Sequence, residues 1–388
     1  MTSTPHPAAA DAAANAAAGR TAAENGHAAT AAAEAAAGTA TATAGTARAD
    51  RPARVPWGAV ALFLVLALGL AWLVALPLWQ RDPDSPEFAA LFSPLAQAMM
   101  FTPALAAVAA LFVARVPRGE RLRFLGMWPL RPAKRVVWFT VAALFAPVVI
   151  VLASIGVAAA FGWAELDLVE FSGFAATIAA SLPEGIDSMM PPVGLLIALQ
   201  FVAIPFGAVF NCIFTFGEEL GWRGWLLPAL RPLGTWPALV ISGVIWGLWH
   251  SPLILLGYNF GLTDWRGVAL MVVGCVAWGI LLGWTRLRTG SVWPAVVGHG
   301  ALNASGSLLL LFIAAGTTPD PALVLPIGVA GWIAIAAVLV VLVLTGQFAE
   351  ERQPELAPRR ARAVPTAADA AGTVPAAPDA GTRASDAV

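Results

Sequence analysis

The chain has 388 residues, of which 59% are hydrophobic and only 12% are charged. This composition excludes an ordinary soluble globular protein and indicates an all-α, polytopic membrane protein. The formal net charge of -1 gives no general attraction to polyanions, so we expect no nucleic-acid partner.

Both ends of the chain are predicted to be disordered cytoplasmic tails. Residues 1–55 are rich in Ala, Thr and Gly, and residues 348–388 return to Ala, Pro, Arg and Asp. Neither segment has the hydrophobic periodicity needed to bury a core. We therefore expect a transmembrane domain over residues 56–347, with a tail on either side.

About eight segments are apolar over enough residues to cross a bilayer as helices. In chain order they lie near residues 57–79, 89–114, 136–162, 193–231, 236–257, 267–285, 292–314 and 322–346. The fourth segment is nearly continuous from Pro192 to Arg231, a length of about 40 residues. Such a helix should tilt strongly, protrude from the membrane, or break near Gly217.

Basic residues favour one side of these segments. The loop at 115–135 holds most of them, and further arginines precede the first segment and follow the fourth and sixth. The alternate loops are poor in basic residues and hold most of the carboxylates. The positive-inside rule therefore places both termini in the cytoplasm, as an even number of spans requires. We expect a multi-pass protein of the plasma membrane.

Two adjacent glutamates interrupt the fourth apolar segment, and Arg223 follows them. Ionisable groups at membrane depth are costly and usually face a bundle interior or a water-filled cavity. On a helix, Glu219 and Arg223 are one turn apart in the favoured order for an ion pair. Glu218 projects about 100° away from Glu219. It lacks that partner and is therefore the better candidate for chemistry.

The two histidines of the apolar region lie in later segments. His250 is in the fifth segment, one turn after Trp246, and His299 is in the seventh, one turn before Asn303. Counted from the cytoplasmic boundary, Glu218 and His250 lie about 20 Å deep and His299 about 12 Å deep. We therefore expect these groups to converge on a cavity in the cytoplasmic half of the membrane or near its midplane.

These side-chain types suit the hydrolysis of a peptide bond. Glu218 with His250 can activate a water, and His299 with Asn303 can stabilise an oxyanion. A variant with a divalent metal such as zinc would use Glu218, His250 and His299 as ligands. Two alternatives need no hydrolysis: the polar groups join helices, or they relay protons in a transporter. No repeat between the halves of the chain supports a transporter.

Three motifs in the chain resemble the signature of the CPBP intramembrane proteases. They are Glu218-Glu219-x-x-x-Arg223, Trp246-x-x-x-His250 and His299-x-x-x-Asn303. The family includes the CAAX prenyl endopeptidases and the Abi-type bacteriocin-immunity proteins, and the resemblance covers about residues 190–310. It implies that Glu218 and both histidines are catalytic and that Asn303 assists the oxyanion. The second family motif often has Phe where this chain has Trp246.

The resemblance leaves the metal open, because the family is called a metalloprotease and a metal-independent glutamate mechanism is also proposed for it. We expect an intramembrane endopeptidase that cleaves a membrane-associated substrate near the cytoplasmic face. Its partners would be a peptide or membrane-protein substrate and the lipid bilayer. The alternative is a non-catalytic immunity or scaffolding protein that keeps the same fold.

Overall fold

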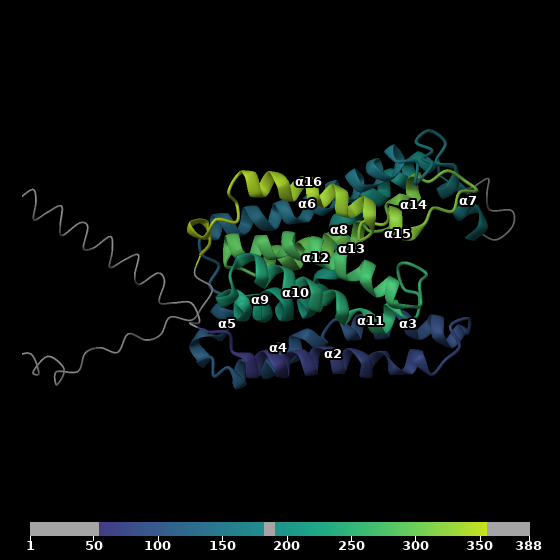
Figure 1. Ribbon diagram of the computed structural model, residues 1–388. Coiled ribbons are helices and arrows are strands. Elements are labelled where there is room, and N and C mark those ends of the chain that lie inside the picture. Colours follow the sequence, from purple (N-terminus) through teal and green to yellow (C-terminus); the bar gives the residue numbers. More distant parts are fainter. Residues whose placement is uncertain (1–53, 182–190, 355–388) are drawn as a thin grey trace, which may run out of the picture. The chain divides into compact units, whose positions relative to one another are not determined.

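The computed structural model describes residues 54–181 and 191–354, and these residues form a helical bundle (Figure 1). They all belong to one compact unit of the chain. The tails predicted for residues 1–55 and 348–388 lie almost entirely outside the described residues.

The longer helices account for most of the bundle. They are α2 (Trp57–Trp79), α3 (Pro86–Met99), α4 (Thr102–Val113), α6 (Ala133–Ala160), α7 (Ser172–Ser181), α8 (Val193–Glu219), α10 (Thr235–Trp249), α12 (Trp265–Thr289), α13 (Trp293–Ser305) and α16 (Val329–Leu344). Short helical turns join them. These are η1 (Arg118–Glu120), α5 (Arg121–Phe124), η3 (Leu220–Leu226), α9 (Leu227–Leu230), η4 (Arg231–Leu233), α11 (Ser251–Ile254), α14 (Leu309–Phe312), α15 (Pro321–Val324) and η5 (Glu350–Arg352).

Seven helical segments within the described residues are long and apolar enough to cross a membrane, where the sequence predicted about eight. The all-helical membrane fold is thereby confirmed. The difference is the predicted fifth span, which is the 15-residue helix α10 followed by the short helix α11. Pro252 has no N–H to continue the hydrogen-bond ladder, so α10 ends just before it. The Ser251 hydroxyl donates to the Leu248 carbonyl oxygen there.

The predicted fourth span is one continuous helical segment of 41 residues, Val193–Leu233. It does not break at Gly217. Instead the α-helical geometry of α8 changes to the wider π-helix η3 at Leu220, directly after the two glutamates. π-Helical turns inside α-helices are frequently found at functional sites.

Glycines allow the helices that carry the motifs to pack closely. A Cβ atom at Gly217 would lie 2.6 Å from the Met100 carbonyl oxygen, and Gly221 packs as tightly one turn later. On α10, a Cβ atom at Gly247 would lie 2.4 Å from the Cα atom of Val272 on α12. Small residues at such crossings bring membrane helices together. They hold α8 against α4, and α10 against α12.

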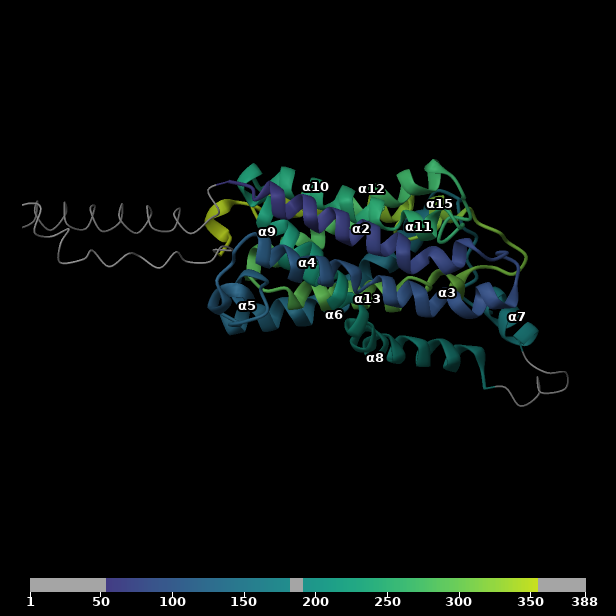
Figure 2. The same cartoon turned by 90° about the horizontal axis from the view of Figure 1, so that it is seen from below.

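The helices run side by side, so that the connecting segments gather at two ends (Figures 1 and 2). α5 and α9 lie at one end, together with the start of α2 and the end of α16, and α7, α11 and α15 lie toward the other. We call the first the basic end, because it carries Arg115, Arg118, Arg121, Arg123, Arg131, Lys134, Arg135, Arg231, Arg288 and Arg352 against Glu120, Glu350 and Glu351. We call the second the acidic end, because it carries Asp82, Asp84, Glu87, Glu165, Asp167, Glu170, Asp264 and Asp320 against Arg81 and Arg266.

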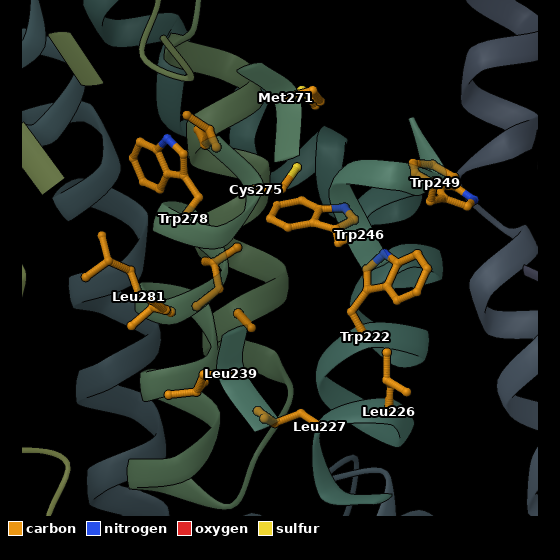
Figure 3. Close-up of a cluster of buried hydrophobic side chains, with 14 of the residues drawn as sticks. Trp222, Leu226, Leu227, Leu239, Trp246, Trp249, Met271, Cys275, Trp278 and Leu281 are labelled. Carbon is orange, nitrogen blue, oxygen red and sulfur yellow. The ribbon is translucent and has the colours of Figure 1, made fainter. Parts of the chain in front are cut away.

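The half of the bundle next to the basic end is filled with large buried side chains. We call this cluster the basal core; its members are Trp222, Trp225, Leu226, Leu227 and Leu239. Figure 3 shows the leucines of this cluster below Trp222, with Trp246 above them. Phe63 of α2 lies against both Trp222 and Trp225, with ring centroids 5.5 and 5.0 Å apart.

Arg286 is fully buried beside the basal core and joins three segments of the chain. Its Nε donates to the Arg223 carbonyl oxygen at 3.0 Å, and Nη2 donates to the Phe124 carbonyl oxygen at 2.7 Å. These bonds tie α12 to η3 and to α5. They also satisfy backbone oxygens that would be costly to leave without a donor at this depth.

Candidate active site

The predicted site residues lie around one cavity. Glu218 and Glu219 form the last turn of α8 and Arg223 lies in η3, while His250 separates α10 from α11. His299 and Asn303 lie on α13. Glu218, His250, His299 and Asn303 line the cavity. Glu219 and Arg223 stand behind this lining, and their side chains are almost completely buried.

The Glu219 carboxylate connects two of the motifs. Its Oε1 accepts a hydrogen bond from Arg223 Nη1 at 2.7 Å, so the predicted ion pair is confirmed. The same oxygen lies 3.0 Å from His299 Nδ1 on α13. Buried charges are tolerated when they are paired in this way, and removing one partner is costly. Glu219 therefore fixes the position of the His299 ring.

Glu218 has a different environment from its neighbour, as the helix geometry predicted. Its Oε2 accepts a hydrogen bond of 2.6 Å from the indole Nε1 of Trp246. No hydrogen bond from the described residues reaches its Oε1, and the side chain lines the cavity. One carboxylate oxygen is thus held by the protein while the other is free to bind a water.

The Trp246 indole contacts the other groups of the site as well. The Arg223 guanidinium lies 4.3 Å from its ring centroid, a cation–π distance. The His299 ring meets it edge to face at a centroid distance of 5.2 Å, and the His250 centroid is 5.9 Å away. The sequence identified Trp246 only by its aromatic character. Its role as a hydrogen-bond donor depends on a contact across 28 residues of chain.

Hydrogen bonds determine which nitrogen of each neutral histidine faces the cavity. His250 Nδ1 lies 2.9 Å from the Trp246 carbonyl oxygen, which can only accept. His299 Nδ1 faces the Glu219 carboxylate in the same manner. In both rings Nδ1 therefore carries the hydrogen and Nε2 is left with its lone pair. Both histidines can accept a proton at Nε2.

The cavity has a volume of about 620 Å³, within the usual range of ligand pockets. Besides the motif residues, it is lined by polar side chains that the sequence analysis missed: Ser93, Gln97, Asn211, Tyr258, Asn259 and Ser307. Asn211 carried a usable signal, because it precedes Glu218 by two helical turns and thus shares its face. Asn303 makes no side-chain hydrogen bond with the described residues, so its amide can serve a ligand.

The candidate metal ligands do not form a metal site as they are arranged. No group of three His, Cys, Asp or Glu side chains within residues 54–181 and 191–354 could hold a metal ion. One oxygen of Glu218 already binds the Trp246 N–H, which competes with a metal for that oxygen. The side-chain types of Glu218, His250 and His299 are ones that zinc accepts, but in this arrangement they do not together surround a metal ion.

Comparison with known proteins points to the same part of the chain. Residues 197–305 match the family described as type II CAAX prenyl endopeptidase Rce1-like. The chain is also similar to CAAX prenyl protease 2 of Methanococcus maripaludis, with 28% identity over 125 residues. That similarity covers 30% of this chain and 45% of the relative, so the chain matches less than half of its length. The family match runs from α8 into the last turn of α13 and contains every predicted site residue.

Proposed function

We propose that this chain is an intramembrane endopeptidase. Its substrate would be a membrane-associated peptide or protein. The premise is the match of residues 197–305 to the Rce1-like family of type II CAAX prenyl endopeptidases. The observation that carries the proposal is the Glu218 carboxylate, which is 2% exposed, held at one oxygen by Trp246 and open to a cavity at the other.

In the proposed reaction, Glu218 Oε1 accepts a proton from a water as the water oxygen attacks the scissile carbonyl carbon. Breakdown of the tetrahedral intermediate then breaks the C–N bond. Glu218 returns the proton to the leaving nitrogen, so that a carboxylic acid and an amine are formed. One carboxylate acts first as base and then as acid, which requires it to stay fixed in place.

The developing oxyanion needs donors, and the cavity offers two. The Asn303 amide has free N–H groups. His299 can donate from Nε2 when protonated, and the Glu219 carboxylate at Nδ1 would balance the charge of the imidazolium. His250 presents its Nε2 lone pair and can hold the attacking water together with Glu218.

Cleavage of membrane-tethered peptides in liposomes tests this function. Purified protein is reconstituted with a library of quenched, lipid-anchored peptides, and Glu218→Gln is compared with Glu170→Gln, an exposed carboxylate at the acidic end. We expect Glu218→Gln to lose at least about 100-fold in rate, the scale of general acid–base catalysis, and Glu170→Gln to match the parent. Folded protein that cleaves nothing in a broad library would refute the proposal and favour an immunity or scaffolding role.

A further inference from the structure

Asn211 is a polar side chain in the middle of the membrane-crossing segment Val193–Leu233. Its neighbours Phe210 and Ile213 are 60% and 56% exposed and face outward from α8, whereas Asn211 lines the cavity. A polar group at this depth is costly unless water, protein or a ligand satisfies it. The proposed reaction gives Asn211 no part, so its place in the cavity needs a separate explanation.

One hydrogen bond determines which way the Asn211 amide points. Its Nδ2 donates to the Gly207 carbonyl oxygen at 2.8 Å. Because that oxygen can only accept, the amide nitrogen faces it and Oδ1 faces away. Within residues 54–181 and 191–354 no donor reaches Oδ1. An asparagine that joins membrane helices bonds to a neighbouring helix. Asn211 instead bonds to its own helix and keeps a free acceptor.

The crossing of α8 and α13 holds this amide in place. A Cβ atom at Gly300 would lie 2.5 Å from the Ala208 carbonyl oxygen, and one at Gly207 would lie 3.4 Å from the Cβ atom of Ala304. The two helices therefore touch directly beside the turn that carries Asn211. Because the acceptor of the amide belongs to this crossing, Oδ1 has its position before a ligand binds. Such preorganisation lowers the entropic cost of binding.

A peptide in the cavity supplies the donor that Oδ1 lacks. Each residue of a peptide other than proline carries a backbone N–H, which loses its water inside the protein and needs a new acceptor. Asn211 precedes Glu218 by two helical turns, which is about 10 Å along α8. An extended peptide covers about 3.3 Å per residue, so a peptide along α8 with its scissile bond at Glu218 reaches Asn211 after about three residues.

We propose that Asn211 is a substrate-binding residue, whose Oδ1 accepts a hydrogen bond from the backbone N–H of a substrate residue about three positions from the scissile bond. The acceptor is neutral, so it recognises the main chain of the substrate and not a charged side chain. Such a contact binds the substrate and the transition state alike, and therefore acts on KM more than on kcat. The contact rests on the proposed function, which puts the scissile bond at Glu218.

An ester scan of the substrate tests this contact. A lipid-anchored peptide that the parent cleaves is made as a series, in which one backbone N–H at a time on either side of the scissile bond is replaced by an ester oxygen. Asn211→Leu removes the acceptor at nearly constant shape, and the Gly207 carbonyl keeps its backbone hydrogen bond within α8. Gln200→Leu is the control, because Gln200 is an exposed amide on the same helix and does not line the cavity.

In the parent we expect one ester, about three residues from the scissile bond, to raise KM roughly 2- to 12-fold with kcat within about twofold, the range for one neutral hydrogen bond. Asn211→Leu should raise the KM of the unmodified peptide by a similar factor, and the same ester should then have no further effect. Gln200→Leu should respond as the parent does. The proposal is overturned if Asn211→Leu keeps the parent KM, or if its effect multiplies with that of every ester.

Binding to Glu218→Gln separates this contact from the protease that it rests on. The same peptides are titrated against this variant, with and without Asn211→Leu. Cleavage by the parent with ester effects that are independent of Asn211 refutes the contact and keeps the protease. Binding that depends on Asn211 and on one ester, without cleavage by the parent, refutes the protease alone. A chain that neither binds nor cleaves any of the peptides refutes both.

Discussion

Replacing Trp246 by phenylalanine should impair catalysis while leaving the fold intact. The substitution removes the indole N–H that donates to Glu218 Oε2 at 2.6 Å. It keeps an aromatic ring beneath the Arg223 guanidinium and beside the His299 ring. Glu218 then loses the only hydrogen bond that it receives from the described residues.

The size of the effect follows from the charge on the acceptor. A hydrogen bond to a charged group contributes about 1.5–3 kcal/mol. If this bond holds Glu218 in its reacting position, losing it should lower kcat roughly 10- to 150-fold. KM should change little, because the bond contacts the carboxylate that we propose to be catalytic and not the substrate. Cleavage of a lipid-anchored peptide in liposomes, measured over a range of substrate concentrations, gives both constants.

Trp249→Phe is the matched control. Trp249 also lines the cavity and is also buried, but its indole donates to the neutral Thr102 hydroxyl at 3.0 Å. We expect it to lose about 0.5–1.5 kcal/mol of stability and to keep its turnover rate. If Trp246→Phe stays within about twofold of the parent, or if both variants lose activity equally, the indole does not position Glu218.

Four further predictions follow from other contacts. Glu219→Gln leaves Arg223 without its counter-charge, so the free energy of unfolding in detergent should fall by about 3–5 kcal/mol. Glu120→Gln is the control: it breaks the partly exposed pair with Arg123 and should lower the free energy of unfolding by less than about 1 kcal/mol. Cleavage should persist in the presence of a zinc chelator, and loss that is restored by added zinc would contradict the metal-free reaction. Gly221→Ala should lower the melting temperature, because the new Cβ atom would lie 2.3 Å from the Cβ atom of Pro103. Gly156→Ala is the control and should leave the melting temperature unchanged, because no atom lies within 4 Å of its new Cβ. Hydrogen bonds from the Ser172 side chain and from backbone N–H groups hold the pKa of Asp167 below its ordinary value. The Asp167 carboxylate should therefore stabilise the 167–172 loop fully at neutral pH, and this stabilisation should be lost as the pH falls below about 4. Amide hydrogen exchange at Glu170 and Ser172, measured against pH, would report the loss.

The sequence predicted those contacts that lie within a single helix. The Glu219–Arg223 pair follows from a spacing of four residues, and the separate orientation of Glu218 follows from the rotation of about 100° between neighbouring residues of a helix. From local spacing we instead paired His299 with Asn303 and left Glu219 to Arg223 alone. The contact between Glu219 and His299 joins residues 80 positions apart and depends on how α8 packs against α13. No local pattern contains that information.

The path of the helices was predictable only in part. Apolar length located the membrane-crossing segments, but the early end of α10 depends on how the chain turns at Pro252. The π-helical geometry of η3 also leaves no clear mark in the composition. The sequence therefore identified the side chains that meet at the cavity, while their partners across the bundle required tertiary structure.

The basal core has a consequence for the membrane as an electrical barrier. A hydrolase that brings water to mid-membrane risks opening a leak for ions, and the tightly packed half of the bundle prevents it. Across the packed half, moving one charge against the membrane potential costs up to about 2.3 kcal/mol per 100 mV. Glu218 lines the cavity on the other side of this packing.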